Sequence, residues 1–269
     1  MIRSLALHPY LAVFKTRYLL LLQYRAAAIA GIVTQIFFGL VRAMILEGFY
    51  AASSAPQPMP LAQAITYVWL GQAFLLLVPW TTDGELKRMI QSGNVAYELV
   101  RPVDLYGVWF FRSVAQRIAP TTLRAIPLLI LAWIFFGMQL PISPAAAMAW
   151  LVSTACAFLL AGAFTTLITI SFMWTIGGEG TARLLPSLAF FFSGMVIPLP
   201  LFPEWAQGVI SFLPFRGLID GPFRLYSGHI AARDAWQVIG HQLIWTALFI
   251  LLGRYLIKRG LKRLVVQGG

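Results

Sequence analysis

Long stretches without a charged side chain dominate this sequence of 269 residues. Five intervals of at least sixteen residues contain no Asp, Glu, Lys or Arg, and the longest runs from 125 to 178. A charge at the centre of a lipid bilayer costs at least ~2.5 kcal/mol, so segments that cross a bilayer lie between charges. A crossing helix needs about 20 apolar residues. The pattern therefore predicts an all-α, polytopic membrane protein.

The composition supports this class and excludes others. Charged residues make up 11% of the chain and apolar residues 59%, whereas a soluble domain carries about 25% charged residues. The single Cys cannot form an internal disulfide, and three scattered His predict no metal site. The basic residues flank apolar runs and are not interleaved with stacking aromatic residues, so we expect no nucleic-acid partner.

The charge-free intervals can be divided into six spans. The interval 125–178 is too long for one crossing and contains Pro141 and Pro144, where a turn is expected. The interval 48–82 holds one crossing because its first part, 52–60, is polar and rich in Pro. The whole chain, 1–269, is one transmembrane domain. The expected spans lie at about 26–46, 62–82, 120–139, 145–174, 184–201 and 236–257.

The basic residues predict the orientation of these spans. Sixteen Lys and Arg fall on the side that holds both termini, and three, Arg216, Arg224 and Arg233, fall on the other. Cytoplasmic segments carry the excess of Lys and Arg. Both termini are therefore expected in the cytoplasm.

Three segments outside the spans have patterns of their own. Residues 1–25 contain an amphipathic stretch that predicts a helix at the membrane interface, or equally a cytoplasmic start to the first span. The loop 83–119 predicts a short helix with Leu86, Met89 and Ile90 on one face, followed by a helix that starts at Asp104. This loop is either a docking surface or a solvated, lipid-anchoring loop. The loop 201–235 predicts one short helix, too short to cross a bilayer, that can dip into it.

Candidate cargo contacts are less distinctive. Small residues recur every four positions from Ser153 to Thr169, a spacing that favours close helix packing and leaves a cargo path as the alternative. Arg42 is the only charge well inside a predicted span, and it either snorkels to the interface or contacts cargo. An apolar wall suits an amphiphilic cargo. The substrate-path candidates are Arg42, Phe164, Thr165, Thr169, Phe191 and Met195.

Two sequence motifs resemble a known family. Ser92-Gly93 followed by Leu99-Val-Arg101-Pro102, and Phe192-Ser-Gly-Met-Val-Ile-Pro198 followed by Pro203-Glu-Trp205, are similar to segments of the permease subunits of ABC-2 type ATP-binding-cassette transporters. The resemblance implies an exporter permease in the bacterial cytoplasmic (inner) membrane, with a second permease chain and two copies of an ABC ATPase subunit as partners. ATP and Mg²⁺ would bind to the ATPase, since this chain has no phosphate-binding loop.

The resemblance also assigns two sets of residues. The external gate would contain Pro203, Trp205, Phe212 and Pro214. The ATPase-coupling segment would contain Glu85, Leu86, Lys87, Arg88, Met89, Ile90, Gly93, Arg101 and Pro102.

Two other classes remain as alternatives. A secondary transporter or channel would need acidic residues within the membrane for coupling, and the acids here lie in loops or at span ends. An enzyme would need a nucleophile and a base within reach of each other. We therefore expect transport without catalysis on this chain.

Overall fold

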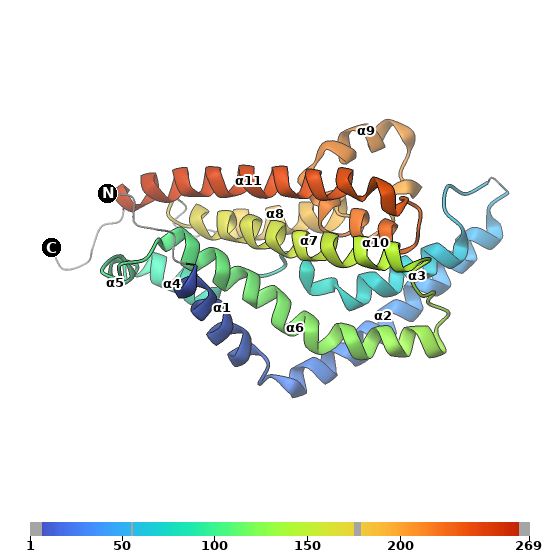
Figure 1. Cartoon of the computed structure of the whole chain (residues 1–269), viewed down its shortest axis with the longest axis horizontal. Coiled ribbons are helices and arrows are strands. Elements are labelled where there is room, and N and C mark those ends of the chain that lie inside the picture. Colours follow the sequence, from blue (N-terminus) through green and yellow to red (C-terminus); the bar gives the residue numbers. More distant parts are fainter. Residues whose placement is uncertain (1–6, 55, 175–178, 264–269) are drawn as a thin grey trace.

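The computed structural model describes residues 7–54, 56–174 and 179–263. Four helices in this part are long and apolar enough to cross a membrane. They are α2 (Arg25–Ala52), α6 (Leu105–Phe135), α7 (Pro144–Ser171) and α11 (Ala235–Gly260), the last extended by the preceding turn from residue 232. Helices α7 and α11 run along the long axis of the molecule, while α2 and the first half of α6 run obliquely to it (Figure 1).

Shorter helices complete the described chain. The one before α2 is α1, and two of the others, α3 and α8, overlap predicted spans. Short 3-10 turns follow α3 at Leu75–Leu77 and precede α10 at Pro214–Gly217. The bounds are α1 His8–Leu21, α3 Leu61–Ala73, α4 Gly84–Gln91, α5 Ala96–Leu99, α8 Glu179–Phe192, α9 Glu204–Phe212 and α10 Asp220–Tyr226.

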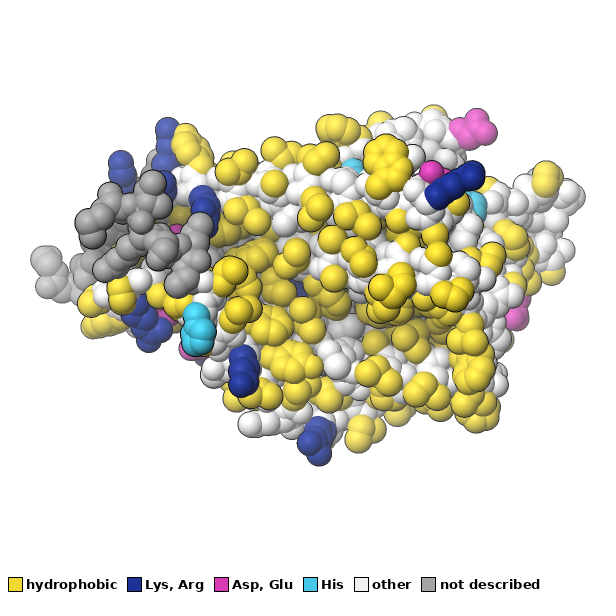
Figure 2. Space-filling model, in the orientation of Figure 1, with side chains coloured by type: hydrophobic (Ala, Val, Ile, Leu, Met, Phe, Trp, Pro, Cys, Tyr) yellow, Lys and Arg dark blue, Asp and Glu magenta, His cyan; other side chains and the backbone are white. Residues whose placement is uncertain are grey.

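The two ends of the molecule differ from its middle. Helices α4 and α5 lie at one end, and α9 with the connection between α2 and α3 lies at the other (Figure 1). Hydrophobic side chains cover most of the visible middle, while Lys and Arg gather toward the α4 and α5 end (Figure 2). On α2 the large residues Ile29, Val33, Phe37 and Met44 are more than half exposed. This surface has the distribution expected of a bilayer-embedded protein.

The predicted spans 26–46, 145–174 and 236–257 correspond to α2, α7 and α11, with α2 longer than expected. The helix predicted at Asp104 is confirmed, because the Asp104 carboxylate accepts a hydrogen bond from the Gly107 amide at 3.0 Å and caps α6. The prediction that this helix is separate from the span at 120–139 is wrong. Both form the single helix α6, which continues through Pro120 and Pro127.

The helical part of the predicted span 62–82 ends early, at Ala73 in α3. Arg117 of α6 is 3% exposed and donates to the carbonyl oxygens of Val78, at 3.2 Å, and Thr81. These carbonyls belong to an extended segment and are satisfied from outside α3. Carbonyls that would bond within a longer α3 bond to the Arg117 guanidinium instead. The chain is extended at these residues and leads into α4.

The helical part of the predicted span 184–201 also ends early, at Phe192 in α8. Gly194 has a φ of +90°, a backbone conformation that favours glycine. A Cβ built at this position would lie 2.3 Å from the Tyr67 hydroxyl of α3. The close approach of α3 and the left-handed turn stop α8 before the predicted end.

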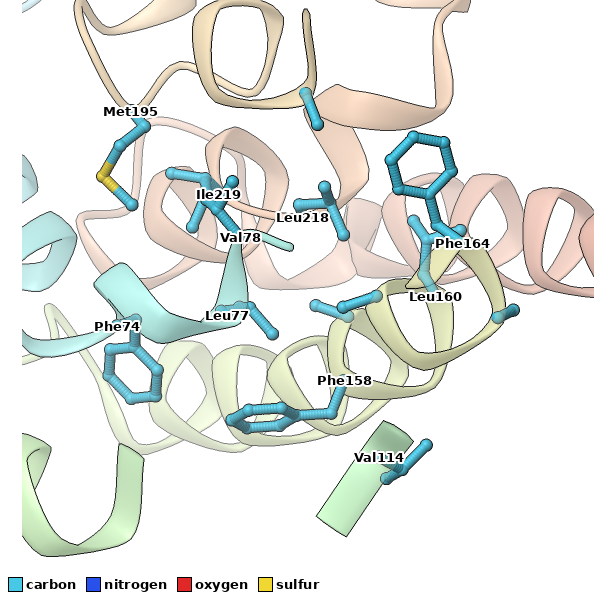
Figure 3. Packing of buried hydrophobic residues seen from close by; sticks show 14 of the residues in the cluster. Phe74, Leu77, Val78, Val114, Phe158, Leu160, Phe164, Met195, Leu218 and Ile219 are labelled. Atoms are coloured by element: carbon cyan, nitrogen blue, oxygen red, sulfur yellow. The ribbon is translucent and has the colours of Figure 1, made fainter. Parts of the chain in front are cut away.

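Helix α7 forms the centre of the bundle. Its small-residue stripe is fully buried, and a Cβ at Gly162 would lie 2.4 Å from a methyl carbon of Val114 in α6. Phe158, Leu160 and Phe164 point from α7 into the hydrophobic cluster (Figure 3). The helix-packing interpretation of the stripe is therefore confirmed.

Candidate functional site

The first candidate site is a cluster of charges that joins α1, α4 and α6. Asp83 caps α4 by accepting hydrogen bonds from the amides of Glu85, at 3.0 Å, and Leu86, at 3.3 Å. Its second carboxylate oxygen accepts from Arg17 of α1 at 3.2 Å and from Arg112 of α6. Arg112 also pairs with Glu85. One guanidinium thus holds two acids of the α4 N-terminus, which fixes α4 against its neighbours.

The electrostatics of this cluster favour ionised Asp83. The Asp83 side chain is only 3% exposed. Burial alone would raise the pKa of the Asp83 carboxyl, but the hydrogen bond and charge of Arg112 and the charge of Arg17 lower this pKa below its usual value. Asp83 is therefore ionised in the folded protein at neutral pH.

The structure corrects the predicted role of the apolar stripe on α4. Leu86 is 1% exposed and Ile90 is 4% exposed, so both pack inside this chain and neither is available to an ATPase. Met89 is half-buried, and the Lys87 ammonium lies 5.4 Å from the ring centroid of Phe172. The apolar stripe therefore packs α4 against the helix bundle of this chain.

The outward face at this end consists of other residues. Tyr97 is 75% exposed and Val100 is 82% exposed, although both are large and one is apolar. Glu98 accepts a hydrogen bond from the Trp109 indole of α6 at 3.1 Å and fixes the segment that carries them. We call the following set the coupling surface: Arg88, Tyr97, Leu99, Val100, Arg101 and Pro102, all of them exposed.

Sequence reasoning included Arg88, Arg101 and Pro102 but missed Tyr97, Leu99 and Val100 as exposed contacts. The Ser92-Gly93 pair in the sequence suggests a turn that could have pointed to these residues. Gly93 does have a positive φ, of +75°. A reversal at this glycine puts Val95 back into the core, where it is 0% exposed, and turns the next helix outward.

The predicted substrate-path residues divide into two groups. Phe164, Thr165 and Thr169 are at most 5% exposed, with Phe164 packed on Phe215 and Phe249. The Thr165 hydroxyl accepts from Arg117 at 3.0 Å. These three side chains pack in the interior of the chain and do not line the cavity that contains Arg42, so their role in a substrate path stays a prediction.

Arg42 and Met195 do line a cavity, of about 300 Å³, between α2, α3 and the segment 194–198. The Arg42 guanidinium donates to the Met195 carbonyl oxygen at 2.9 Å. The other lining residues are mostly apolar, including Ile45 and Val68. Phe191 lies outside this cavity, is 45% exposed and contacts Phe192 and Phe202. The cavity thus combines one guanidinium with apolar walls.

The short helix predicted in the external loop is α9, at Glu204–Phe212. Trp205, Val209 and Phe212 share one face and are 83%, 66% and 73% exposed. Ala206 and Ile210 on the opposite face pack on Leu199. Pro203 precedes the helix and Pro214 begins the 3-10 turn after it. Helix α9 thus presents an apolar face outward.

The structure adds a buried acid near α9 that sequence reasoning counted only as a loop residue. Asp220 is 2% exposed and accepts hydrogen bonds from the Tyr67 hydroxyl and the Leu199 amide, both at 3.3 Å. Arg224 donates to its other oxygen at 3.2 Å. This cluster joins α3, α10 and the chain before α9.

These features define a multi-pass membrane protein with a fixed helix at one end and an apolar helix at the other. The family model described as "ABC-2 family transporter protein" matches residues 60–268, so the chain belongs to the ABC-2 transporter family. Members of this family are membrane subunits without their own catalytic activity and normally work with an ABC ATPase. No curated protein and no solved structure matches the chain.

We expect the substitution Asp83→Asn to destabilise the protein at neutral pH and not in acid. Asn keeps the helix cap but removes the charge that pairs with Arg112 and Arg17. Breaking a buried pair costs about 3 kcal/mol. Because folding lowers the pKa of Asp83, its stabilisation is present above the ordinary carboxylate pKa of ~3.9 and is lost as pH falls through the folded value.

The measurement is thermal unfolding of both purified proteins in detergent, from pH 7 down through the ordinary carboxylate pKa of ~3.9 to about pH 2. Asp234→Asn is the control, since this acid pairs with Arg233 at 3.8 Å on the exposed surface and should matter little. Equal stability of wild type and Asp83→Asn at pH 7 would contradict the prediction.

Proposed function

We propose that this chain is the membrane-spanning permease of an ATP-driven exporter in the bacterial cytoplasmic membrane. Two ABC ATPase subunits bind at the α4 and α5 end, and ATP and Mg²⁺ bind to them. A second permease chain completes the transporter. The observation that carries the proposal is the ion-paired attachment of α4 to α1 and α6, because a coupling helix must transmit force to the spanning helices.

The contacts of the two shorter helices support six crossings. At the start of α3 the Gln63 amide donates to the Ser227 carbonyl oxygen at 3.3 Å, near α10. The same stretch of chain ends at Asp83, which is paired with α1 and α6 at the opposite end. Residues 61–83 thus connect the two ends of the molecule, partly as helix and partly as extended chain.

Helix α8 connects the ends in the same way. The Thr181 and Ser171 hydroxyls lie 3.2 Å apart beside the last turn of α7. At the other end of α8 the Ser193 carbonyl oxygen accepts from the Asp220 amide at 3.1 Å. With α3 and α8 as crossings, both termini, the interfacial helix α1 and the coupling surface fall on the cytoplasmic side.

Cysteine labelling tests this orientation. After Cys156 is replaced, a Cys at Ser54 should react in intact cells with a membrane-impermeant thiol reagent, and a Cys at Ser92 should react only after permeabilisation. Both positions are exposed on the protein, so a difference in labelling reports the side of the membrane on which each Cys lies. The reverse labelling pattern would overturn the orientation and the position of the ATPase.

The coupling surface has the composition of a protein-binding patch. Tyr and Arg dominate the binding energy at such patches, particularly around an apolar centre, and here Tyr97, Val100 and Arg88 supply these groups. An apolar cavity of about 290 Å³, lined by Pro9, Val13 and Pro102 among others, adjoins the surface. An apolar side chain of the ATPase can enter this cavity while the permease residues contact its rim.

Val100→Asp should reduce co-purification of the ATPase at least tenfold and stop ATP-dependent transport. A charge at the centre of a desolvated patch is unfavourable, and Val100 is too exposed to stabilise the fold. Leu140→Asp is the control at the opposite end, where Leu140 is 59% exposed. Normal ATPase binding by Val100→Asp would show that this surface is not the docking site.

The cavity beside Arg42 supports an amphiphilic, lipid-like or drug-like cargo. It joins an apolar wall to one guanidinium, which suits a molecule with an apolar body and a polar or anionic group. The exposed apolar faces of α2 and α9 are surfaces on which a second permease can close the path. The position of the cavity, beside α2 in the half of the bundle that contains α9, supports release of the cargo on that side.

Filling this cavity should stop export. Gly71 lines it, and a Cβ there would lie 3.3 Å from the Met195 sulfur, so Gly71→Leu occupies cargo space. Export of a fluorescent amphiphile by the complex in cells should fall at least tenfold, with ATPase co-purification unchanged. Gly48→Leu is the control, because nothing lies within 4 Å of a Cβ at Gly48. Wild-type export by Gly71→Leu would remove the cavity from the path.

A further inference from the structure

A third cavity, of about 380 Å³, lies between the 3-10 turn at Pro214–Gly217, α10 and the start of α11. Its wall contains Arg216, Arg224, His229 and His241. A neighbouring cavity of about 310 Å³, toward α9, shares Arg216, Asp220, Arg224 and His229. At this end of the molecule a group of charged and His side chains interrupts the hydrophobic surface (Figure 2).

The nitrogen donors in this wall are not fully used. Arg216 is half-buried, and among the described residues its guanidinium makes no hydrogen bond and no ion pair. The Nε of Arg224 is buried without a hydrogen-bond partner in the same part of the structure. Buried polar groups of this kind normally have a partner.

Of the three acids around the two cavities, Asp220 is buried and fully engaged, whereas Asp234 and Glu204 lie toward solvent. Asp220 accepts from Tyr67, the Leu199 amide and Arg224. Asp234 lies 3.8 Å from the guanidinium of Arg233, and Glu204 is exposed in the first turn of α9. Arg224 is therefore paired with Asp220, while Arg216 makes no ion pair within the described residues. The surplus at this site is one of guanidinium N–H donors.

Arg216 is held in place by both of its neighbours. The Phe215 ring packs against Phe164 of α7 with centroids 5.5 Å apart. The Gly217 carbonyl oxygen accepts from Gln242 of α11 at 2.7 Å, and Gln242 also bonds to Ser153 of α7. The backbone of Arg216 is therefore preformed, and a ligand needs to order only the side chain.

We propose that this cavity binds a phosphate group at the α9 end of the permease. A phosphate has several acceptor oxygens, which two guanidinium groups and an imidazole can share. The phosphate comes from a lipid headgroup or from free phosphate in solution. The external location of the cavity rests on the proposed orientation, but the binding chemistry does not.

Binding to the purified full chain in neutral detergent tests the proposal by isothermal titration calorimetry. The probes are inorganic phosphate, dihexanoyl phosphatidic acid and dihexanoyl phosphatidylcholine. We expect phosphatidic acid, inorganic phosphate or both to bind, and phosphatidylcholine to bind at least tenfold more weakly because its headgroup has no net charge. Binding should weaken as salt is added.

Arg216→Gln should weaken phosphate binding at least tenfold. The variant should fold normally, because it removes no hydrogen bond or ion pair of the described chain, and its unfolding temperature checks this. Arg233→Gln is the matched control: it removes the same charge on the same side of the molecule, from a side chain that is 86% exposed, and should change affinity less than twofold.

The results distinguish the two sources of phosphate, and they test the phosphate site independently of the proposed exporter function. Binding of phosphatidic acid alone identifies a lipid headgroup, and binding of inorganic phosphate identifies a free anion. No binding of either probe, or equal affinity in Arg216→Gln, overturns the site. Because no ATPase and no transport are involved, a negative result here leaves the exporter proposal intact, and a failed transport assay leaves this site intact.

Discussion

The buried guanidinium of Arg117 determines how the rest of the chain is arranged. A charge in an apolar interior is stable only when hydrogen-bond acceptors surround it, and Arg117 finds them in the carbonyls of Val78 and Thr81 and the hydroxyl of Thr165. Those carbonyls are free because α3 has ended. Helix α4 begins directly after this segment, so the position of the coupling surface depends on an interaction between α6 and α7.

Each end of the bundle is held by a buried acid that pairs with arginine. Asp83 joins α1, α4 and α6, and Asp220 joins α3, α10 and the chain before α9. Ion pairs of this kind contribute little net stability but strongly penalise any arrangement that separates them. The two clusters therefore define a few allowed positions for the helices at each end, which suits a protein that alternates between states.

The long helices could be predicted from the sequence because lipid excludes charge, and α2, α7 and α11 follow the charge-free intervals. The ends of α3 and α8 could not be predicted, because they depend on contacts made by Arg117 and on the approach of Tyr67 to Gly194. The same limit applies to the sites. Helical periodicity identified Leu86 and Ile90 as one face of α4, but a single chain does not reveal whether that face meets the core or a partner.

The small residues of α7 restrict where this permease can change during evolution. With α6 and α11 packed directly against them, a larger side chain at Ala157, Ala161 or Gly162 would push neighbouring helices apart. Residues around Arg42 lie at the edge of the bundle, where exchange of one side chain alters a cavity without moving a helix. Natural variants with different cargo preferences should therefore differ on α2 and in segment 194–198, over an α7 that stays the same.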